Sequence, residues 1–451
     1  MPEEKELITH PIPKLITRIA VPASVGFFFN TMFNVVDTYF GGLISTEVLA
    51  ALSLSLSVYF IIIAMGTGIS TGTTALIANA LGAGNRQQAR LFATQGITFG
   101  ILTAIVLTFL GIYLSPYLFA ILGATDRYLV TSILYMNTIF TGTVFFLLAY
   151  MLNAILNALG DTRSFRNFLI TGFFLNIIFD PWFIYGGVGL PALGIVGIGL
   201  ATVVIQCLGC LYLGFKVYRT GVIVGKELRE IFPMLRPFKE IARQGLPASI
   251  NMITVGIGFF VITYFASKFG KEAVAAYGIG IRVEQMILIP TVGLNIATLT
   301  LAAQNNGAGL FARVRETLTT ALRYGGIIMA AGTVIIFVLA PYFMALFTDD
   351  ETVITIGITY LRIDSLVFYA YVILFTSIAA MQGIKKPMFA IWIGFARQLV
   401  APLIVFTILI DILHCGLLGI WWGFFSITWG AAVFTIVYVL HHLKGLINAE
   451  S

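Results

Sequence analysis

Charged residues, cysteine and histidine are scarce in this sequence of 451 residues. Only 10% of the residues are Asp, Glu, Lys or Arg, whereas 59% are hydrophobic and the mean hydropathy is +0.97. A soluble domain of this composition would expose large apolar patches, so the composition excludes a soluble protein. The cysteines include the pair Cys207-x-x-Cys210, but no second pair or nearby histidine accompanies it, which argues against structural zinc.

Long apolar runs dominate the chain instead. They are unbroken, unlike the alternating strands of a membrane β-barrel, and each can cross a bilayer as a helix of about 20 residues. We therefore predict an all-α integral membrane protein with twelve transmembrane helices. The predicted spans are 16–40, 48–80, 92–114, 128–158, 165–186, 192–217, 241–266, 272–303, 317–340, 352–381, 388–411 and 416–442. The second, fourth, eighth and tenth are longer than a bilayer requires, so we expect them to tilt or project.

The basic residues predict the orientation of these spans. Short loops rich in Lys and Arg stay cytoplasmic, and such loops carry Arg163, Arg166, Lys385 and Lys386. The opposite side has the acidic cluster Asp349-Asp350-Glu351. We expect a multi-pass protein of the cytoplasmic (plasma) membrane with both termini in the cytoplasm. The net charge of +6 follows from this bias, so no nucleic-acid partner is expected.

The first part of the chain is repeated. Residues 16–90 recur without a gap as residues 241–315, so that Pro22-Ala23-Ser24 returns as Pro247-Ala248-Ser249. Each copy opens a group of six spans, and because six is even the second group enters from the same side as the first. The repeats are therefore parallel. We predict two pseudo-symmetric six-helix lobes joined by a cytoplasmic linker, with boundaries at 1–217, 218–240 and 241–451.

Four acidic residues, Asp37, Asp180, Glu284 and Asp364, lie inside predicted spans. A charged group at the bilayer centre costs at least about 2.5 to 3.5 kcal/mol, so each of them needs a reason. Asp37 aligns with Ile262 in the second copy. This asymmetry assigns the chemistry of Asp37 to the first lobe.

The first-lobe acids lie among other polar side chains. Asn30, Asn34 and Asp37 recur at i, i+4 and i+7 and so share one helical stripe, and Pro22 upstream permits a bend.

In the fifth span, Asn176 lies one turn before Asp180, and Pro181 again permits a bend. The small residues that begin the sixth span bring the Thr202 hydroxyl inward. Together with Asp37, these oxygen donors could hold a hard cation such as Na⁺ or share a proton. The alternative is that the polar groups only bond across helices, at roughly 0.6 to 2 kcal/mol each.

Other first-lobe side chains are candidates for a substrate cavity, in which aromatic rings would hold a lipophilic cation. They are Asn30, Phe33, Asn34, Tyr135, Asn137, Asn153 and Asn157. Core or lipid packing is the alternative for the rings, and bonding between helices is the alternative for the asparagines.

The second lobe has a different charge pattern. Arg282 and Glu284 lie two residues apart, as do Arg362 and Asp364, and side chains at this spacing do not face each other on a helix. Each acid would have to pair across helices, with Arg397 as a third cation. We expect charge-paired locks or a gating network here rather than substrate ligands.

Six short motifs are spread over the first lobe. They are Pro22-Ala23-Ser24, Val36-Asp37-Thr38, Gly82-Ala83-Gly84-Asn85, Asn157-x-x-Gly160-Asp161-Thr162, Asn176-Ile177-Ile178-Phe179-Asp180-Pro181 and Gly199-Leu200-Ala201-Thr202. Combined with the two-lobe repeat, they resemble the multidrug and toxic compound extrusion (MATE) transporters over nearly the whole chain. The resemblance implies two six-helix bundles forming a V around a central cavity. It also implies alternating access that exports organic, mostly cationic and amphipathic compounds against inward Na⁺ or H⁺.

Carried over to this sequence, the family's cation site falls on Asp37, Asn176, Asp180 and Thr202, with Na⁺ held by the last three, and its bendable first helix falls on Pro22. Some relatives instead carry a glutamate in the seventh span and an aspartate deep in the tenth. The seventh span here has no acid, and the acid of the tenth lies early. The chain is therefore similar to the branch named for the DNA-damage-inducible protein F and its archaeal relatives.

Two alternatives use similar features. A flippase of lipid-linked saccharides resembles this architecture, but it would need several cations for a pyrophosphate, and only Arg282, Arg362 and Arg397 are available. An intramembrane aspartyl protease would need Tyr-Asp and Gly-x-Gly-Asp contexts, which Asp37 and Asp180 lack. We expect a monomeric transporter and not an enzyme, whose partners are small organic cations and the lipid bilayer. No cofactor is expected, and H⁺ or Na⁺ would be the coupling ion.

Overall fold

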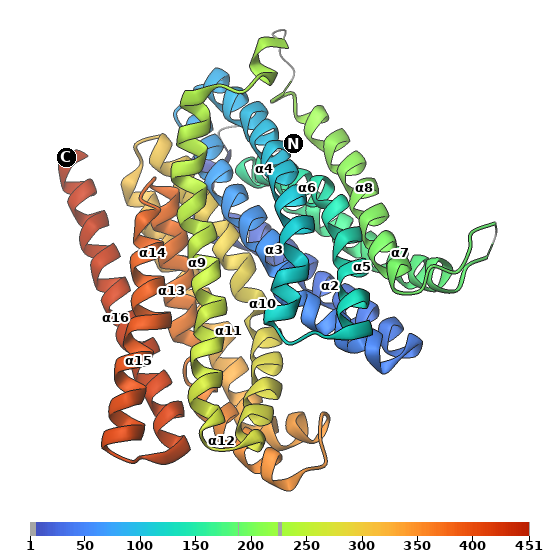
Figure 1. Cartoon of the computed structure of the whole chain (residues 1–451). Coiled ribbons are helices and arrows are strands. Elements are labelled where there is room, and N and C mark those ends of the chain that lie inside the picture. The colour runs from blue at the N-terminus through green and yellow to red at the C-terminus, as the bar shows by residue number, and fades with distance from the viewer. Residues whose placement is uncertain (1–5, 188, 224–227, 451) are drawn as a thin grey trace. The chain divides into compact units, whose positions relative to one another are not determined.

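The computed structural model describes residues 6–187, 189–223 and 228–450 (Figure 1). No strand occurs among these residues. In this part of the chain, ten helices are long and apolar enough to cross a membrane, and two bent pairs of shorter helices raise the number to twelve if each pair is one span. The predicted all-α membrane fold is therefore confirmed. Residues 224–227 of the predicted linker lie outside the described part of the chain.

The chain forms two compact units, here called unit 1 and unit 2. In the described chain, unit 1 contains residues 25–249, and unit 2 contains residues 6–24 and 250–450. Two long helices, α2 (Ile12–Ile44) and α9 (Leu235–Ser267), contribute to both units, because each unit boundary falls inside one of them.

The other helices belong to a single unit. Those of unit 1 are α3 (Thr46–Gly82), α4 (Arg86–Ile121), α5 (Asp126–Thr141), α6 (Thr143–Ala158), α7 (Arg163–Tyr185), α8 (Ile195–Thr220) and the 3₁₀ turn η1 (Leu228–Ile231). Those of unit 2 are α1 (Glu6–Thr9), α10 (Lys271–Gly307), α11 (Phe311–Ala345), α12 (Glu351–Ser365), α13 (Phe368–Gly383), α14 (Met388–Phe395), α15 (Ala401–Phe406) and α16 (Gly416–Glu450). Two π-helical segments, η2 (Ala396–Val400) and η3 (Thr407–Ile412), flank α15.

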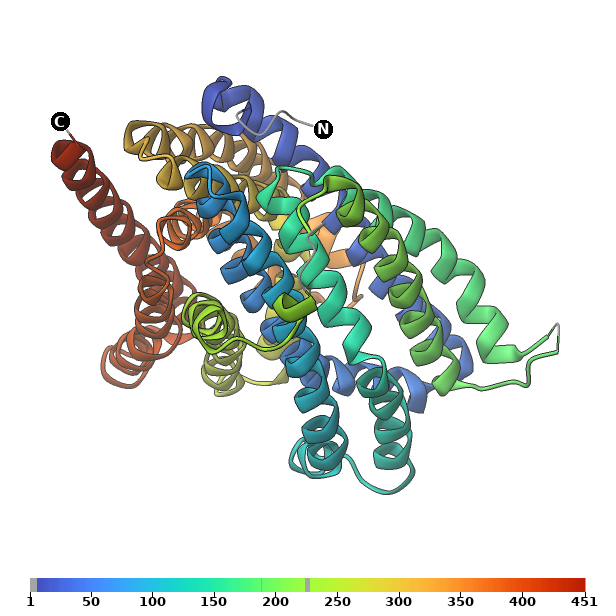
Figure 2. The ribbon, with the colours of Figure 1, turned by 90° about the horizontal axis from the view of Figure 1, so that it is seen from above.

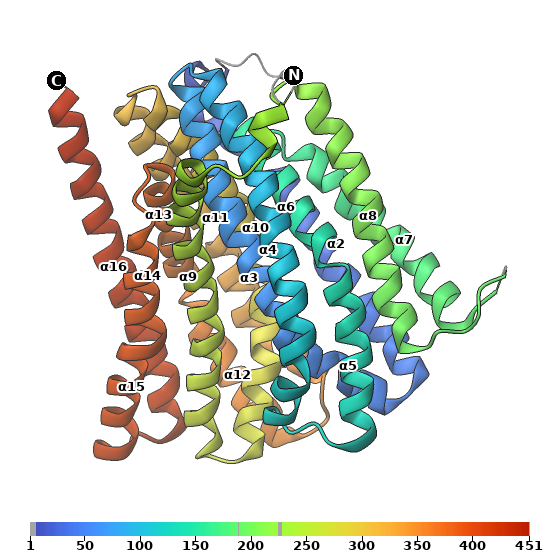
Figure 3. The ribbon, with the colours of Figure 1, turned by 45° about the horizontal axis from the view of Figure 1, so that its top comes forward.

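The two units repeat one packing scheme. Within unit 1, α3, α4 and α6 pack against one another, and α7 runs beside α8 (Figures 1 and 3). Within unit 2, α10, α11 and α13 form the corresponding group, and α15 runs beside α16 at the red end of the chain (Figure 2). Each unit therefore has a helical core of its own.

The helix that opens each repeat begins in the other unit: α2 begins in unit 2 and continues in unit 1, whereas α9 begins in unit 1 and continues in unit 2. In unit 1, a Cβ added to Gly68 of α3 would lie 2.6 Å from the Cα of Ser249 in α9. At the equivalent position in unit 2, Gly293 of α10 packs directly against Ser24 of α2. The Ser24 hydroxyl also donates to the backbone oxygen of Pro290 at 3.5 Å. The repeated Pro-Ala-Ser motif thus marks a crossing at which a glycine lets two helix backbones approach.

Capping residues explain where several of these helices begin and end. The Ser45 side chain accepts from the backbone N–H of Val48 at 3.1 Å before α3, and Asn85 accepts from that of Gln88 at 2.9 Å before α4. The repeated Gly-Ala-Gly motif ends α3 and α10, with Gly84 at φ +72° and Gly309 at φ +77°. Glycine adopts this left-handed conformation at the lowest steric cost, which explains the motif in both copies.

The fourth and tenth predicted spans are each bent into two helices. The bend between α5 and α6 is 47°, and that between α12 and α13 is 49°. Side chains from neighbouring helices bond the carbonyls that the bends leave free: Thr108 donates to the Phe140 oxygen at 2.8 Å, and Thr333 donates to the Ser365 oxygen at 2.6 Å. The two threonines lie 225 residues apart in the sequence, which is the repeat distance, and so do Phe140 and Ser365. The bends are therefore a shared feature of the repeat, stabilised by insertion into the helical hydrogen-bond ladder.

The connection from α8 to α9 is anchored on α4 within unit 1. Arg90 donates two hydrogen bonds to the Glu230 carboxylate, at 2.7 and 3.0 Å. The Gln95 amide donates to the backbone oxygens of Glu230 and Phe232 at 2.6 and 2.8 Å, and its oxygen accepts from the Met234 N–H at 2.9 Å. The ion pair and the amide bonds together hold η1 against α4.

Candidate functional site

Helix α7 carries a stripe of buried residues at helical spacing. Phe168, Gly172, Asn176 and Asp180 follow one another every four residues, and all four are buried. One turn of an α-helix is 3.6 residues, so these side chains share a face that packs against protein. The two polar members of the stripe are therefore held in the interior of unit 1.

The amide of Asn176 connects two carboxyl groups. Its Nδ2 donates to Oδ1 of Asp37 in α2 at 2.9 Å and to Oδ1 of Asp180 at 3.0 Å. The Asp180 carboxyl and the Thr202 hydroxyl of α8 are also close enough to Asp37 to interact with it. Three helices thus bring together Asp37, Asn176, Asp180 and Thr202, which we call the four-residue site.

This site is shielded from water and short of hydrogen-bond donors. Asn176 and Asp180 are fully buried, and Asp37 and Thr202 are 8% and 5% exposed. Among the described residues, neither Oδ1 of Asn176 nor Oδ2 of Asp180 has a hydrogen-bond partner. Two adjacent buried carboxylates repel each other, so a proton or a cation between them removes an unfavourable charge. The arrangement can therefore hold one small positive charge with oxygen ligands.

Small residues in α8 allow α7 to come close enough to complete the site. A Cβ added to Gly197 would lie 2.6 Å from the backbone carbonyl of Phe183 in α7. Thr202 donates its hydrogen to the Ile198 oxygen at 3.1 Å, which leaves the lone pairs of its hydroxyl as an acceptor for a cation. The close approach of α7 to the glycines of α8 thus brings Thr202 near Asn176 and Asp180.

Two tyrosines lie near the acids. The Tyr135 phenol is close enough to Asp37 and Asp180 to interact with both electrostatically, and the Tyr59 phenol interacts with Asp37. Sequence reasoning identified Tyr135 but missed Tyr59, which occupies the position of Glu284 in the second copy. That difference between the copies is the signal by which Tyr59 could have been found.

The remaining cavity candidates are scattered over unit 1. Asn34 is exposed and donates to the backbone oxygen of Asn30 in its own helix at 3.0 Å, and Phe33 is half-buried beside it. Asn137 accepts a bond of 3.4 Å from Ser115. Asn153 and Asn157 are buried in α6. None of these contacts joins a candidate to the four-residue site.

Both predicted bending residues lie inside uninterrupted helices. Pro22 is in α2 and Pro181 is in α7, directly after Asp180. Each proline lacks the amide hydrogen that would bond to the carbonyl four residues earlier, so α2 and α7 each lose one backbone hydrogen bond. In α7 this loss is directly beside Asp180, and in α2 it is on the helix that carries Asp37. Their role in bending stays a prediction.

The five residues predicted to form a charge-paired lock or gate in unit 2, Arg282, Glu284, Arg362, Asp364 and Arg397, do not form ion pairs with one another in the described chain. Among the described residues, no nitrogen of Arg282, Arg362 or Arg397 lies within 4.0 Å of a carboxylate oxygen. Glu284 instead accepts a bond of 3.2 Å from the Tyr360 hydroxyl. Both carboxylate oxygens of Asp364 are buried without a hydrogen-bond partner in the described chain.

Two of these arginines, Arg362 and Arg397, contact aromatic rings instead. The Arg397 guanidinium lies 5.5 Å from the ring centre of Tyr371, and that of Arg362 lies 5.3 Å from that of Phe337. Arg397 is close enough to Glu284 for an electrostatic interaction. These tyrosine contacts were missed from the sequence, although Tyr360 follows Tyr135 by the repeat distance of 225 residues.

Comparisons with known proteins cover nearly the whole chain. The model of the MatE family matches residues 22–182 and 247–407. A probable multidrug resistance protein NorM from Thermotoga maritima is 29% identical over 421 residues, covering 91% of this chain and 89% of that protein. An FAD transporter from Shewanella oneidensis is 26% identical over 401 residues, 88% of each chain. Multidrug export protein MepA from Staphylococcus aureus is 24% identical over 376 residues, 83% of this chain and 82% of that protein.

Solved structures share the fold. A transporter of the MOP superfamily from Pyrococcus furiosus is 24% identical, with a TM-score of 0.92 over 99% of both chains. An outward-facing multidrug resistance transporter of the MATE family has the same identity, TM-score and coverage. The whole described architecture, and not one segment of it, is therefore common to these proteins and to this chain.

Proposed function

Because the chain belongs to the MatE family of multi-pass membrane transporters, we propose that it is a secondary active antiporter for multidrug efflux. It exports amphipathic organic cations and takes up H⁺ or Na⁺ in exchange, by alternating access. It acts as a monomer in the cytoplasmic membrane with both termini in the cytoplasm. Two relatives, a probable multidrug resistance protein and a multidrug export protein, support the substrate class.

The bridging amide of Asn176 is the observation that carries the coupling proposal. It connects Asp37 and Asp180 by bonds of 2.9 and 3.0 Å, while its own oxygen and the second oxygen of Asp180 have no partner in the described chain. A purely structural contact between helices would use neutral side chains and leave no buried oxygen unpaired. The free oxygens are suited to accept the coupling ion, with Thr202 as a further ligand.

Coupling follows from the charge of the site. When H⁺ or Na⁺ enters, the repulsion between Asp37 and Asp180 is removed and α2, α7 and α8 can pack more tightly. When the ion leaves, the negative charge favours a cationic substrate, so ion and substrate stabilise different conformations. Pro22 and Pro181 each remove a backbone hydrogen bond, which lowers the cost of bending α2 and α7 between these conformations.

The experiment is transport by purified protein in liposomes. Ethidium efflux is followed by fluorescence while an inward Na⁺ gradient or an inward pH gradient is imposed separately. We expect transport in one of the two gradients and its loss in Asp37→Asn and in Asp180→Asn. Asp411→Asn is the matched control, because Asp411 is an exposed acid that pairs with Lys268 at 3.1 Å.

The outcomes distinguish the antiporter from the flippase and test the coupling site. Transport that survives both substitutions at the four-residue site would exclude it as the coupling site. If the folded protein transports no organic cation in either gradient, but moves a fluorescent lipid-linked saccharide across the bilayer, the flippase alternative replaces the antiporter.

A further inference from the structure

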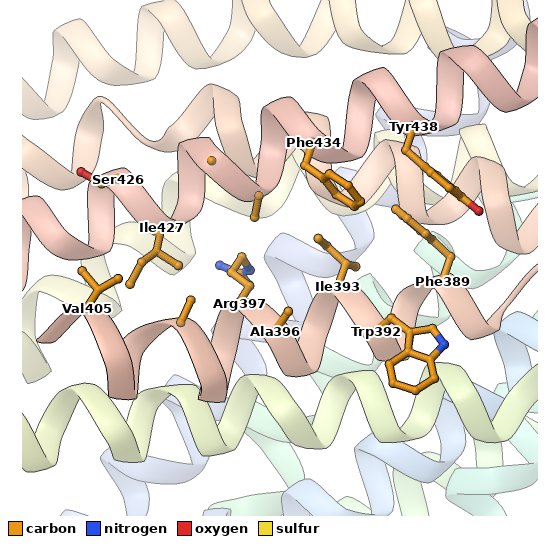
Figure 4. A pocket seen from close by; sticks show the side chains of 13 residues that line it. Phe389, Trp392, Ile393, Ala396, Arg397, Val405, Ser426, Ile427, Phe434 and Tyr438 are labelled. Carbon is orange, nitrogen blue, oxygen red and sulfur yellow. The ribbon is translucent and has the colours of Figure 1, made fainter. Parts of the chain in front are cut away.

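Unit 2 contains a cavity of about 780 Å³ between the helix formed by α14, η2 and α15 and the facing helix α16. Figure 4 shows its walls, with Phe434 and Tyr438 on α16 opposite Phe389 and Ile393 on α14. This volume lies within the range of about 300 to 1,000 Å³ that is typical of small-molecule sites. All 13 lining residues belong to unit 2.

Apart from the Tyr438 hydroxyl and the Trp392 indole N–H, the lining is apolar except at two positions. Aromatic rings close one end, where Phe389 stacks on Tyr438 with ring centres 5.0 Å apart. Aliphatic side chains, including Val405 and Ile427, line the other end. The polar positions are Ser426, whose hydroxyl donates to the oxygen of its own helix at Trp422, and Arg397. A long hydrocarbon chain fits this lining better than a polar molecule does.

The guanidinium of Arg397 lies between the two helices in Figure 4. Arg397 is only 8% exposed, and its Nη1 has no hydrogen-bond partner in the described chain. One face of the group rests on the Tyr371 ring. Glu284 is near enough for an electrostatic interaction, but no carboxylate oxygen of a described residue lies within 4.0 Å of the guanidinium. The π-helical segment Ala396–Val400 sets this position, and such segments often occur at functional sites. A buried cation with a free donor, inside an apolar cavity, calls for an anion attached to hydrocarbon.

The depth of Arg397 selects among such anions. It lies nine residues after Met388, which is roughly 14 Å along the helix at 1.5 Å per residue. That is close to the middle of a hydrocarbon region of about 30 Å, where the phosphate of a bilayer lipid does not reach. The carboxyl group of a fatty acid is small enough to follow its hydrocarbon chain to this depth, where the carboxylate pairs with the guanidinium in a bidentate manner.

We infer that the cavity between α14–α15 and α16 binds a long-chain fatty acid, with its carboxylate on Arg397 and its hydrocarbon chain along the aromatic and aliphatic walls. The fatty acid enters from the surrounding lipid. Trp392, Phe434 and Val437 are 69%, 59% and 63% exposed on these helices, so the cavity is lined and flanked by side chains that lie at the surface of unit 2.

Tryptophan fluorescence tests this inference, because Trp392 lines the cavity. Protein in nanodiscs is titrated with 9,10-dibromostearic acid, whose bromines quench nearby indoles. We expect saturable quenching, which loses its main component in Trp392→Phe. We expect Arg397→Gln to weaken binding of the acid at least tenfold, and the methyl ester to bind the wild-type protein at least tenfold more weakly than the acid does. Lys271→Gln is the control for charge, since its side chain is 93% exposed.

A steric variant tests the site without changing its charge. A Cβ added to Gly430 meets nothing within 4 Å, so Gly430→Leu adds a side chain to the cavity wall without a clash at Cβ. We expect it to abolish saturable quenching by the acid. Equal quenching by the acid, its methyl ester and dibrominated phosphatidylcholine would overturn the inference, as would unchanged binding in Arg397→Gln. If Arg397→Gln does not fold, the comparison of acid with ester and the Gly430→Leu variant decide the matter.

Discussion

The crossing of α3 with the beginning of α9 leaves no room for a side chain at Gly68. A Cβ there would lie 2.6 Å from the Ser249 Cα, and nearer still to the backbone nitrogen of Ser249. Since the obstacle is backbone, Gly68→Ala must separate two helices, and overpacking of this kind costs typically about 1 to 3 kcal/mol. Replacing glycine by alanine inside a helix stabilises the helix by up to about 1 kcal/mol. At the upper end of the packing cost, we therefore expect the free energy of unfolding to fall by about 2 kcal/mol.

Gly278→Ala is the matched control, because Gly278 lies inside α10 and a Cβ there meets nothing within 4 Å. For a cooperative unit of this size, 2 kcal/mol corresponds to a fall of about 4 to 8 °C in the midpoint of thermal unfolding. We expect that fall for Gly68→Ala and for its repeat equivalent Gly293→Ala, measured by tryptophan fluorescence in detergent. Midpoints equal to or above that of Gly278→Ala would refute the close crossing.

Three other changes test the site and its surroundings. Asn176→Leu removes two hydrogen bonds to carboxylates, worth roughly 1.5 to 3 kcal/mol each, and is expected to abolish ion-driven ethidium transport; wild-type rates would show that the amide is dispensable. Thr202→Val removes one oxygen ligand at nearly constant volume, so we expect a several-fold weaker apparent affinity for the coupling ion at an unchanged maximal rate, and an unchanged affinity would exclude Thr202 as a ligand. Glu230→Gln breaks a partly exposed ion pair with Arg90 of the kind worth at most about 1 kcal/mol, so the unfolding midpoint should fall by no more than about 4 °C, and a larger fall would mean that the α8–α9 connection carries more of the stability of unit 1.

The four-residue site could be predicted because its signals are local. Asn176 and Asp180 are one helical turn apart, glycines precede Thr202, and the repeat lacks an equivalent of Asp37. Helical spacing also predicts that Asn34 shares a stripe with Asp37, whereas in the structure Asn34 is exposed and Asp37 is buried. Asp37 follows Asn34 by three residues, which leaves the two side chains roughly 60° apart around the helix axis. This angle is enough for the Asn34 amide to be exposed while the Asp37 carboxyl is buried.

The bend in the tenth predicted span and the second-lobe contacts could not be predicted from local sequence. No glycine or proline interrupts the chain between Ser365 and Phe368, and the bend there is stabilised by Thr333 and by Trp429, which donates to the Leu366 oxygen at 3.0 Å. Likewise, the bond from Tyr360 to Glu284 joins helices that lie 76 residues apart in the chain. Such partners become visible only when the helices have been packed.

The exchange of helix beginnings between the units bears on how the protein is synthesised. The beginning of α2 leaves the ribosome long before Gly293, the residue against which Ser24 packs. During that interval the first segment of the chain has no crossing partner, and unit 1 also stays incomplete until residues up to Ser249 have been made. Folding of the two halves is therefore interleaved, and a gene cut between the repeats would encode two fragments, neither of which contains a complete unit.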